Sequence, residues 1–287
     1  MVARTAAGRG GLGRRRRTAV TVPRSLVLSL ACGSVVAAAC SPTLPEFEVQ
    51  DWRLSTDPAD HADAIARRGR ITVETHRLVL PSCVTQGAIQ LRSGAVSVPI
   101  DLRIEPVPRQ IWITWRGALE SETTYQLRVA GLVDLDGSRQ PTPHTTYFTT
   151  STQQGEQEPD ARVDASAVMA LLAARCASAH CHDAMHAESM LDLSNASGIE
   201  RTARNRAAQV ADDSDRPAPL GSLSHAAVVI LDAHAGHGDP ARSYLVYKLL
   251  GDEHILGDPM PPPGETALSN VELQLIVDWI RVGAPTG

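Results

Sequence analysis

Alternation of apolar and polar residues marks the middle of the chain, from about residue 71 to residue 150. Short runs rich in β-branched and aromatic residues recur there, separated by Gly, Pro and Asp residues at intervals of about ten residues. The clearest runs are Ala95–Ile100, Ile111–Trp115, Tyr125–Val129 and Thr145–Thr150. In the turn that begins at Asp134, Gly137 is suited to a positive φ. The pattern predicts an all-β sandwich or barrel over 71–150.

A helical period replaces this alternation in the C-terminal part of the chain. Residues 163–175 are rich in Ala and Leu, and Asp164 or Ser166 can cap the start of a helix there. Residues 195–240 are polar and irregular, which predicts an elaborated loop region before the last helix.

The last predicted helix covers residues 269–282. It opens on the capping-box pattern S-x-x-E, formed by Ser269 and Glu272. Its apolar residues fall at i, i+3, i+4 and i+7 and therefore share one face; they are Leu273, Ile276, Val277 and Ile280. Gly283 is placed to end this helix.

Two polar stretches divide the chain. Residues 40–70 are rich in Pro and Asp and predict a tether, with a short helical piece near 61–68. Residues 151–162 have almost no apolar content and predict an interdomain linker. The predicted organisation is a signal segment at 1–39, a tether at 40–70, a β-sandwich at 71–150, a linker at 151–162 and a helical domain at 163–287.

The N-terminus has the three-part pattern of an export signal. Residues 1–24 carry seven arginines and no acidic residue, an apolar stretch follows up to Ala39, and three alanines precede Cys40. The apolar stretch is shorter than the about 20 residues that a membrane-spanning helix needs. The small residues that end in Cys40 resemble the lipobox of bacterial lipoproteins, which implies cleavage after residue 39 and lipidation of Cys40. Cys32 as the modified residue, a plain secretory signal and an uncleaved anchor remain alternatives.

Removal of this segment changes the net charge. The whole chain carries −5 and residues 1–39 carry +7, which leaves −12 for the mature chain. An acidic protein lacks the basic surface that nucleic-acid binding requires. We therefore expect a membrane contact through the lipid anchor and no nucleic-acid partner.

The motif that suggests chemistry lies directly after the first predicted helix. Cys176, Cys181 and His182 form the pattern C-x4-C-H. Covalent heme attachment needs two thiols that reach the two vinyl groups, and a histidine directly after the second cysteine that binds the iron. The usual spacing between the cysteines is two residues, whereas here it is four. In an oxidising compartment the same cysteines also suit a local disulfide.

Several turn and strand positions of the β-rich region form a recognisable set. They are Trp115–Leu119, Thr123–Tyr125 with Val129, Asp134–Gly137 and Phe148–Thr150. Together they resemble the bacterial Ig-like domains of surface-layer and other cell-surface proteins. The resemblance implies a spacer or adhesion module without chemistry of its own.

Further blocks follow the cysteine motif in a definite order: Met190–Ser194, Gly238–Pro240 with Ser243, Met260–Pro262 and Trp279–Ala284. The ordered set resembles the cytochrome c-like domains of planctomycetes and related bacteria. It implies a mainly α cytochrome c-like fold, with heme c attached covalently to Cys176 and Cys181. His182 is then the proximal iron ligand, Met260 is the distal iron ligand, and Trp279 helps to cover the porphyrin.

The expected fold class is therefore multidomain, with an all-β Ig-like sandwich followed by a mainly α cytochrome c-like domain. The expected function is one-electron transfer to a redox protein partner in the cell envelope, facing the periplasm or the cell surface. Iron held by His182 and Met260 has no open position for a substrate, so the chain is not expected to be an enzyme.

Other interpretations of the same residues remain open. One is a heme-less structural or binding protein of the envelope with a Cys176–Cys181 disulfide. Another is a peroxidase-like enzyme, which needs iron on His182 with a vacant distal side. Among the other candidate ligands, His180 and His186 can gather a metal together with His182, and His254 is a second candidate for the distal ligand. Cys83 is predicted to be a buried free thiol.

Overall fold

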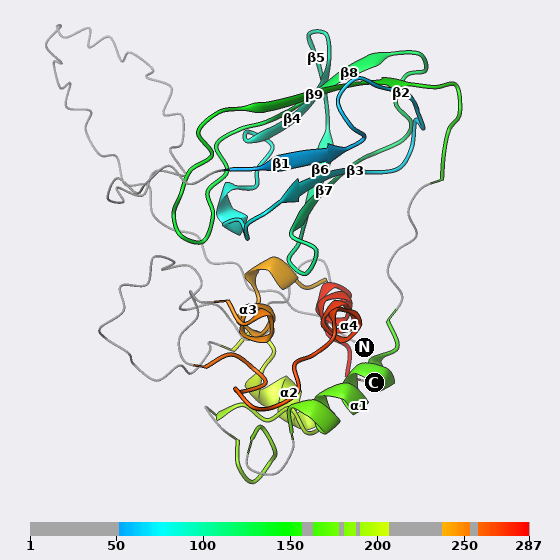
Figure 1. The fold of residues 1–287 in the computed structure, drawn as a ribbon. Helices are drawn as coiled ribbons and strands as arrows, with labels where there is room; N and C mark the ends of the chain where they lie inside the picture. Colours follow the sequence, from blue (N-terminus) through cyan, green and yellow to red (C-terminus); the bar gives the residue numbers. More distant parts are fainter. Residues whose placement is uncertain are drawn as a thin grey trace, which may run out of the picture. The chain divides into compact units, whose positions relative to one another are not determined.

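The computed structural model describes residues 52–156, 163–177, 181–187, 190–206, 237–252 and 258–286. In these ranges a β-sandwich is followed by a helical domain (Figure 1). The signal segment at 1–39 lies outside the described residues, as do Cys40, His180 and His254. No helix in the described ranges is both long enough and apolar enough to cross a membrane.

The sandwich consists of two sheets that face each other (Figure 1). One sheet has the strand order β1-β3-β7-β6, and the other has the order β2-β9-β8-β4-β5. Strands β2 and β9 are parallel, and the other paired strands are antiparallel. The strands are β1 (Leu54–Asp57), β2 (Ala62–Ile65), β3 (Ile71–Thr75), β4 (Ile89–Ser93), β5 (Val96–Val98), β6 (Ile100–Glu105), β7 (Gln110–Trp115), β8 (Thr124–Val129) and β9 (His144–Thr150).

The period-two pattern explains which face of each central strand is buried. In β7, Ile111 and Ile113 are fully buried, and the residues that alternate with them are half-buried. In β8, Leu127 and Val129 are fully buried in the same way. The apolar faces of the two sheets meet in one continuous core. The prediction of an Ig-like sandwich is confirmed.

The sandwich begins earlier than the apolar pattern indicates. Strand β1 pairs with β3, and β2 pairs with β9, although both lie inside the segment 40–70 that was expected to be a tether. The short helical piece expected near 61–68 is absent, because residues 62–65 form β2 instead. These are edge strands, and their half-exposed, Asp-rich sequences carry little of the apolar alternation that marks central strands.

The helical domain contains four α-helices in its described ranges. They are α1 (Ala165–Arg175), α2 (Ala196–Thr202), α3 (Tyr244–Leu250) and α4 (Asn270–Arg281). Short 3-10 turns occur at η1 (Pro81–Cys83) in the sandwich and at η3 (Pro240–Arg242) before α3. Helix α4 packs against α1 and α3 around a separate apolar core (Figure 1).

Helix α4 forms as the sequence predicts. The Ser269 side chain accepts a hydrogen bond from the Glu272 backbone N–H, and the Glu272 side chain accepts one from the Ser269 N–H, which completes the capping box. The predicted apolar face, Leu273, Ile276, Val277 and Ile280, is buried. The chain leaves the helix at Gly283, which has a φ of 95°.

The prediction of a cytochrome c-like fold for 163–287 is wrong. The described residues form only four helices there, and two of these, α2 and α3, are seven residues long. The cysteines are four residues apart, so the C-x-x-C-H motif of that family is absent. No group of three or more His, Cys, Asp or Glu side chains in the described ranges could hold a metal ion. The sequence blocks behind the resemblance serve packing, since Leu193 and Trp279 are fully buried in the helical core.

Candidate functional site

Helix α1 positions the first cysteine. Asp164 caps its N-terminus by accepting a hydrogen bond from the Ser166 backbone N–H at 2.9 Å, and Leu172 anchors it in the helical core. Cys176 is the C-terminal cap, where its backbone N–H donates to Leu172 O at 2.8 Å. The chain therefore leaves the helix at the first residue of the C-x4-C-H motif.

The loop after α1 returns to its own start. The backbone N–H of His182 donates to Cys176 O at 3.1 Å, and the N–H of Leu193 donates to His182 O at 2.8 Å. Cys176 and Cys181 are both half-buried and are not disulfide-bonded. The structure therefore brings Cys176, Cys181 and His182 into one closed loop, without the disulfide that the heme-less alternative requires.

Burial controls the chemistry of the first thiol. Desolvation raises the pKa of Cys176 to about 11, the neighbouring Cys181 adds to this rise, and the positive charge of Arg175 opposes it. At neutral pH the side chain therefore remains a protonated thiol. Such a group is a poor nucleophile, and it exchanges slowly with disulfides because the thiolate is the attacking species.

The His182 ring has a defined orientation. The residue is 8% exposed, and its Nδ1 lies 3.2 Å from the backbone oxygen of Leu191. Because a carbonyl oxygen only accepts hydrogen bonds, Nδ1 carries the proton and donates it to Leu191 O. The neutral ring then has its acceptor lone pair on Nε2, which is the arrangement found in metal-binding histidines.

The Leu191–Asp192 peptide group, whose carbonyl accepts from His182, also donates a hydrogen bond through its N–H. Its N–H belongs to Asp192 and donates to Thr202 Oγ1 on α2 at 2.9 Å. The buried Asp192 carboxylate accepts hydrogen bonds from the backbone N–H and the hydroxyl of Ser194, at 3.0 and 2.6 Å. Sequence reasoning missed Asp192 and Thr202, because their role depends on the approach of α2 to the loop.

The outer part of the loop is a tight turn around Asp183. The Asp183 carboxylate accepts from the backbone N–H groups of Met185 and His186, at 2.7 and 2.6 Å, and these bonds lower the pKa of Asp183. Met185 at the tip is 88% exposed. The metal site that we considered for His180, His182 and His186 gains no support, because the described residues contain no such group and His180 lies outside them.

Met260 lies at the rim of the same apolar core as Cys176. Its backbone N–H donates to Lys248 O at 3.0 Å, and the Lys248 ammonium group donates to Asp258 O at 2.6 Å. Lys248, at the C-terminal end of α3, thus holds the segment before Met260 at two points. Burial lowers the pKa of Lys248.

Two other residues differ in their surroundings from what the sequence suggests. Trp279 is completely buried, and its indole N–H donates to Pro285 O at 2.8 Å, so it serves the core of the helical domain. Cys83 is buried but disulfide-bonded, so the prediction of a free thiol is wrong.

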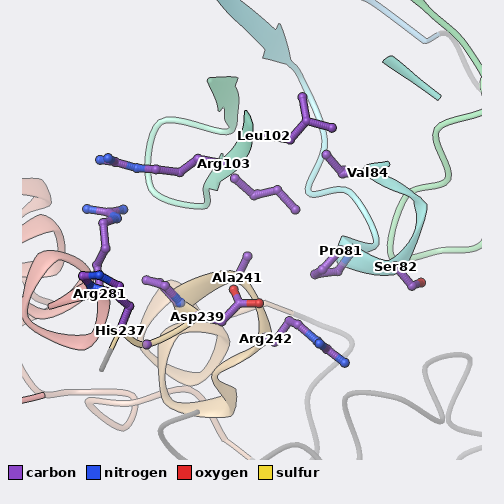
Figure 2. Close-up of a pocket in the computed structure, with 13 residues that line it drawn as sticks. Pro81, Ser82, Val84, Leu102, Arg103, His237, Asp239, Ala241, Arg242 and Arg281 are labelled. Carbon is purple, nitrogen blue, oxygen red and sulfur yellow. The ribbon is translucent and has the colours of Figure 1, made fainter. Parts of the chain in front are cut away.

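A polar cleft of about 760 Å³ lies between η1, β6, η3 and α4. Figure 2 shows Arg103 and Arg281 on one side of the cleft and Pro81 on the other, with Asp239 between them. Both guanidinium groups are bound to the buried Glu105 carboxylate. Because these charges are paired within the protein, the cleft does not define a ligand.

Comparison with known proteins identifies the sandwich. The family described as "Bacterial Ig-like domain" matches residues 53–150, and this part of the chain is a bacterial Ig-like domain. No curated protein matches the chain.

Several solved structures resemble about a third of the chain. One is the N-terminal part of the bacterial S-layer protein SbsC, with 16% identity and a TM-score of 0.28 over 34% of this chain and 23% of that protein. Another is the copper resistance protein PcoC from Escherichia coli, with 18% identity and a TM-score of 0.29 over 36% of this chain and all of PcoC. A third is CopC from Methylosinus trichosporium OB3b, with 13% identity and a TM-score of 0.29 over 38% of this chain and all of CopC. The match spans less than a quarter of the S-layer structure.

Proposed function

We propose that this chain is a cell-envelope lipoprotein, anchored through Cys40, that carries one heme c and passes single electrons to a redox protein partner. Cys176 and Cys181 would hold the heme through thioether bonds, His182 would be the proximal iron ligand and Met260 the distal ligand. The heme would supply the redox-active iron. The proposal rests on this local group of residues and not on the fold of the helical domain.

The observation that carries the proposal is the environment of His182. A buried imidazole directly follows the second of two cysteines that are not disulfide-bonded, and its Nδ1 is bound to the backbone oxygen of Leu191. A hydrogen bond from Nδ1–H to a carbonyl fixes both the tautomer and the ring orientation of a histidine that binds metal through Nε2. A solvated surface histidine needs no such support.

The surroundings of Cys176 and Met260 suit a bound heme. Both residues border the same apolar core, which would exclude water from it. The Ig-like domain, which stands before the helical domain in sequence, would act as a spacer from the lipid surface.

The test is a pyridine hemochrome spectrum of the full-length protein, produced in a host with the cytochrome c maturation machinery. We expect a c-type α band at one heme per chain. The variants Cys176→Ser and Cys181→Ser should lose covalent heme, and His182→Ala should lose the low-spin spectrum. His186→Ala is the matched control, because this exposed histidine of the same loop should leave the spectrum unchanged.

A folded protein without heme would overturn the proposal. Mass spectrometry after thiol alkylation would then identify the alternative: oxidised Cys176 and Cys181 would support a heme-less structural or binding protein of the envelope. A normal low-spin spectrum in His182→Ala would contradict the assignment of His182 even if heme were bound.

A further inference from the structure

The strongest unassigned feature of the helical domain is the contact between α2 and the loop that carries His182. Thr202 lies in the last turn of α2, and its hydroxyl oxygen accepts the hydrogen bond from the Asp192 N–H at 2.9 Å. The same Oγ1 lies 2.8 Å from Gly198 O and 3.2 Å from Asp192 O, and either carbonyl oxygen can accept its proton. In both cases a lone pair of the hydroxyl oxygen accepts from the Asp192 N–H.

The Asp192 N–H and the Leu191 carbonyl belong to one peptide group. Peptide planarity fixes these two bonds on opposite sides of the same rigid unit. When Thr202 holds the N–H, it also sets the direction of the carbonyl that accepts from His182 Nδ1 at 3.2 Å. The orientation of the imidazole thus depends on a residue of α2 that never touches it.

The Leu191–Asp192 peptide group also transmits an electronic effect from Thr202 to the His182 ring. A peptide N–H that donates a hydrogen bond polarises its carbonyl and makes the oxygen a better acceptor, because hydrogen bonds in a chain strengthen one another. A stronger acceptor at Nδ1–H increases the basicity of the imidazole at Nε2. The hydroxyl of Thr202 therefore acts on both the direction and the donor strength of the ring.

The rest of α2 keeps this contact in place. The Asp192 carboxylate lies against Gly198 so closely that a Cβ there would meet its Oδ2 at 2.4 Å. Asn195 caps the helix by accepting from the Gly198 N–H at 3.0 Å. The glycine allows α2 to approach Asp192 closely enough for the Thr202 hydroxyl to reach the peptide group.

We infer that Thr202 is a positioning residue for His182, acting through the Leu191–Asp192 peptide group. As a statement about an iron ligand, this inference rests on the proposed function. Its structural part concerns the His182 ring in the chain itself and is testable whether or not heme is bound.

The decisive comparison is between Thr202→Val and Thr202→Ser. Valine has nearly the same shape but removes the acceptor, whereas serine keeps the hydroxyl. Ser194→Ala is the control, because it removes a hydrogen bond to the Asp192 side chain but leaves the peptide group untouched. The free energies of unfolding of Thr202→Val and Ser194→Ala are measured by denaturant titration. If they are equal, a change seen only in Thr202→Val reflects the orientation of His182 and not a general loss of stability. If they differ, the amide exchange rates are compared after subtracting the difference in stability.

The first readout uses the protein without heme. Hydrogen exchange of the Asp192 amide should rise roughly fivefold to tenfold in Thr202→Val, as expected for the loss of one hydrogen bond. Nitrogen-15 NMR of the His182 ring, assigned by its absence in His182→Ala, should show a lower population of the Nδ1–H tautomer. Thr202→Ser and Ser194→Ala should both resemble the wild type.

The second readout uses the heme-loaded protein. Thr202→Val should raise the reduction potential, because a weaker acceptor at Nδ1–H makes the imidazole a poorer donor to ferric iron. Thr202→Ser should restore the wild-type potential. If the wild type binds no heme, the proposed function fails while the first readout still decides the inference. If the tautomer, the amide exchange and the potential of Thr202→Val all equal those of the wild type, the inference is wrong.

Discussion

Burial of a single sulfur atom sets the chemistry of the site at the residue scale. Cys176 follows α1 directly and faces the helical core, where desolvation opposes loss of its proton. The resulting pKa of about 11 distinguishes this thiol from catalytic and zinc-binding cysteines, whose pKa is lowered by positive charge or by the metal.

Alkylation tests this assignment directly. A rise in pKa from the ordinary value of 9.0 to about 11 lowers the thiolate fraction at pH 8 by roughly a hundredfold. In the heme-free protein, iodoacetamide should therefore modify native Cys176 about a hundredfold more slowly than the same cysteine in the urea-unfolded chain. Because the pKa is raised, the native rate should keep increasing with pH up to about 11. A native rate that levels off near pH 9 in mass spectrometry of this peptide would show that the thiol is solvated.

At the scale of elements, the sequence was most informative where one face of an element is buried. The alternation in β7 and the i, i+3, i+4, i+7 pattern of α4 were sufficient to predict both, because burial of one face imposes the period. The edge strands β1 and β2 were missed, since they take their place from pairing with β3 and β9 rather than from an apolar pattern. Local pattern predicts central elements better than it predicts edges.

In the candidate site, too, local sequence features could be predicted, whereas contacts that depend on the tertiary fold could not. The residues Cys176, Cys181 and His182 could be identified from their spacing, because the motif is contiguous. The peptide group that orients His182 could not, because its contacts reach from the loop to Thr202 on α2 and depend on the tertiary fold. The ordered blocks after the motif suggested a cytochrome c-like fold, although these positions also satisfy ordinary packing.

The second prediction concerns the docking of α2. Gly198 lies in the first turn of this helix, and an alanine Cβ there would meet Asp192 Cγ and Oδ2 at 2.4 Å. Alanine is favoured over glycine in a helix by about 1 kcal/mol, but displacing a buried, hydrogen-bonded carboxylate costs more. We expect Gly198→Ala to lower the free energy of unfolding by about 1–3 kcal/mol in urea titrations.

Ser197→Ala provides the control for this change. Ser197 is the exposed neighbour in the same turn of α2, so its replacement changes helix propensity without touching Asp192. Its effect should stay within about 0.5 kcal/mol. If Gly198→Ala were as stable as Ser197→Ala, the close approach of α2 to Asp192 would be wrong.

At the scale of the whole molecule, a buried carboxylate joins the two domains. Glu105, at the end of β6, is completely buried, and both of its oxygens accept hydrogen bonds from the Arg281 guanidinium, at 2.7 and 2.6 Å. Arg103 binds the same carboxylate from the sandwich, and Asp278 binds Arg281 from within α4. The network spans the end of the last helix and the sandwich, so ion pairs link the Ig-like sandwich to the helical domain.

The third prediction follows from the burial of this network. Removing one partner of a buried ion pair leaves the other charge uncompensated, which costs about 3–5 kcal/mol when no second partner exists. Arg281 retains Asp278 in Glu105→Gln, so we expect a loss of about 2–3 kcal/mol in the free energy of unfolding.

A double-mutant cycle with Arg281→Met should give a coupling energy above about 1 kcal/mol. Glu200→Gln, which breaks the more exposed pair between Glu200 on α2 and Arg204 just after this helix, should cost less than about 1 kcal/mol. If the effects of Glu105→Gln and Arg281→Met were simply additive, this ion pair would not couple the sandwich to the helical domain.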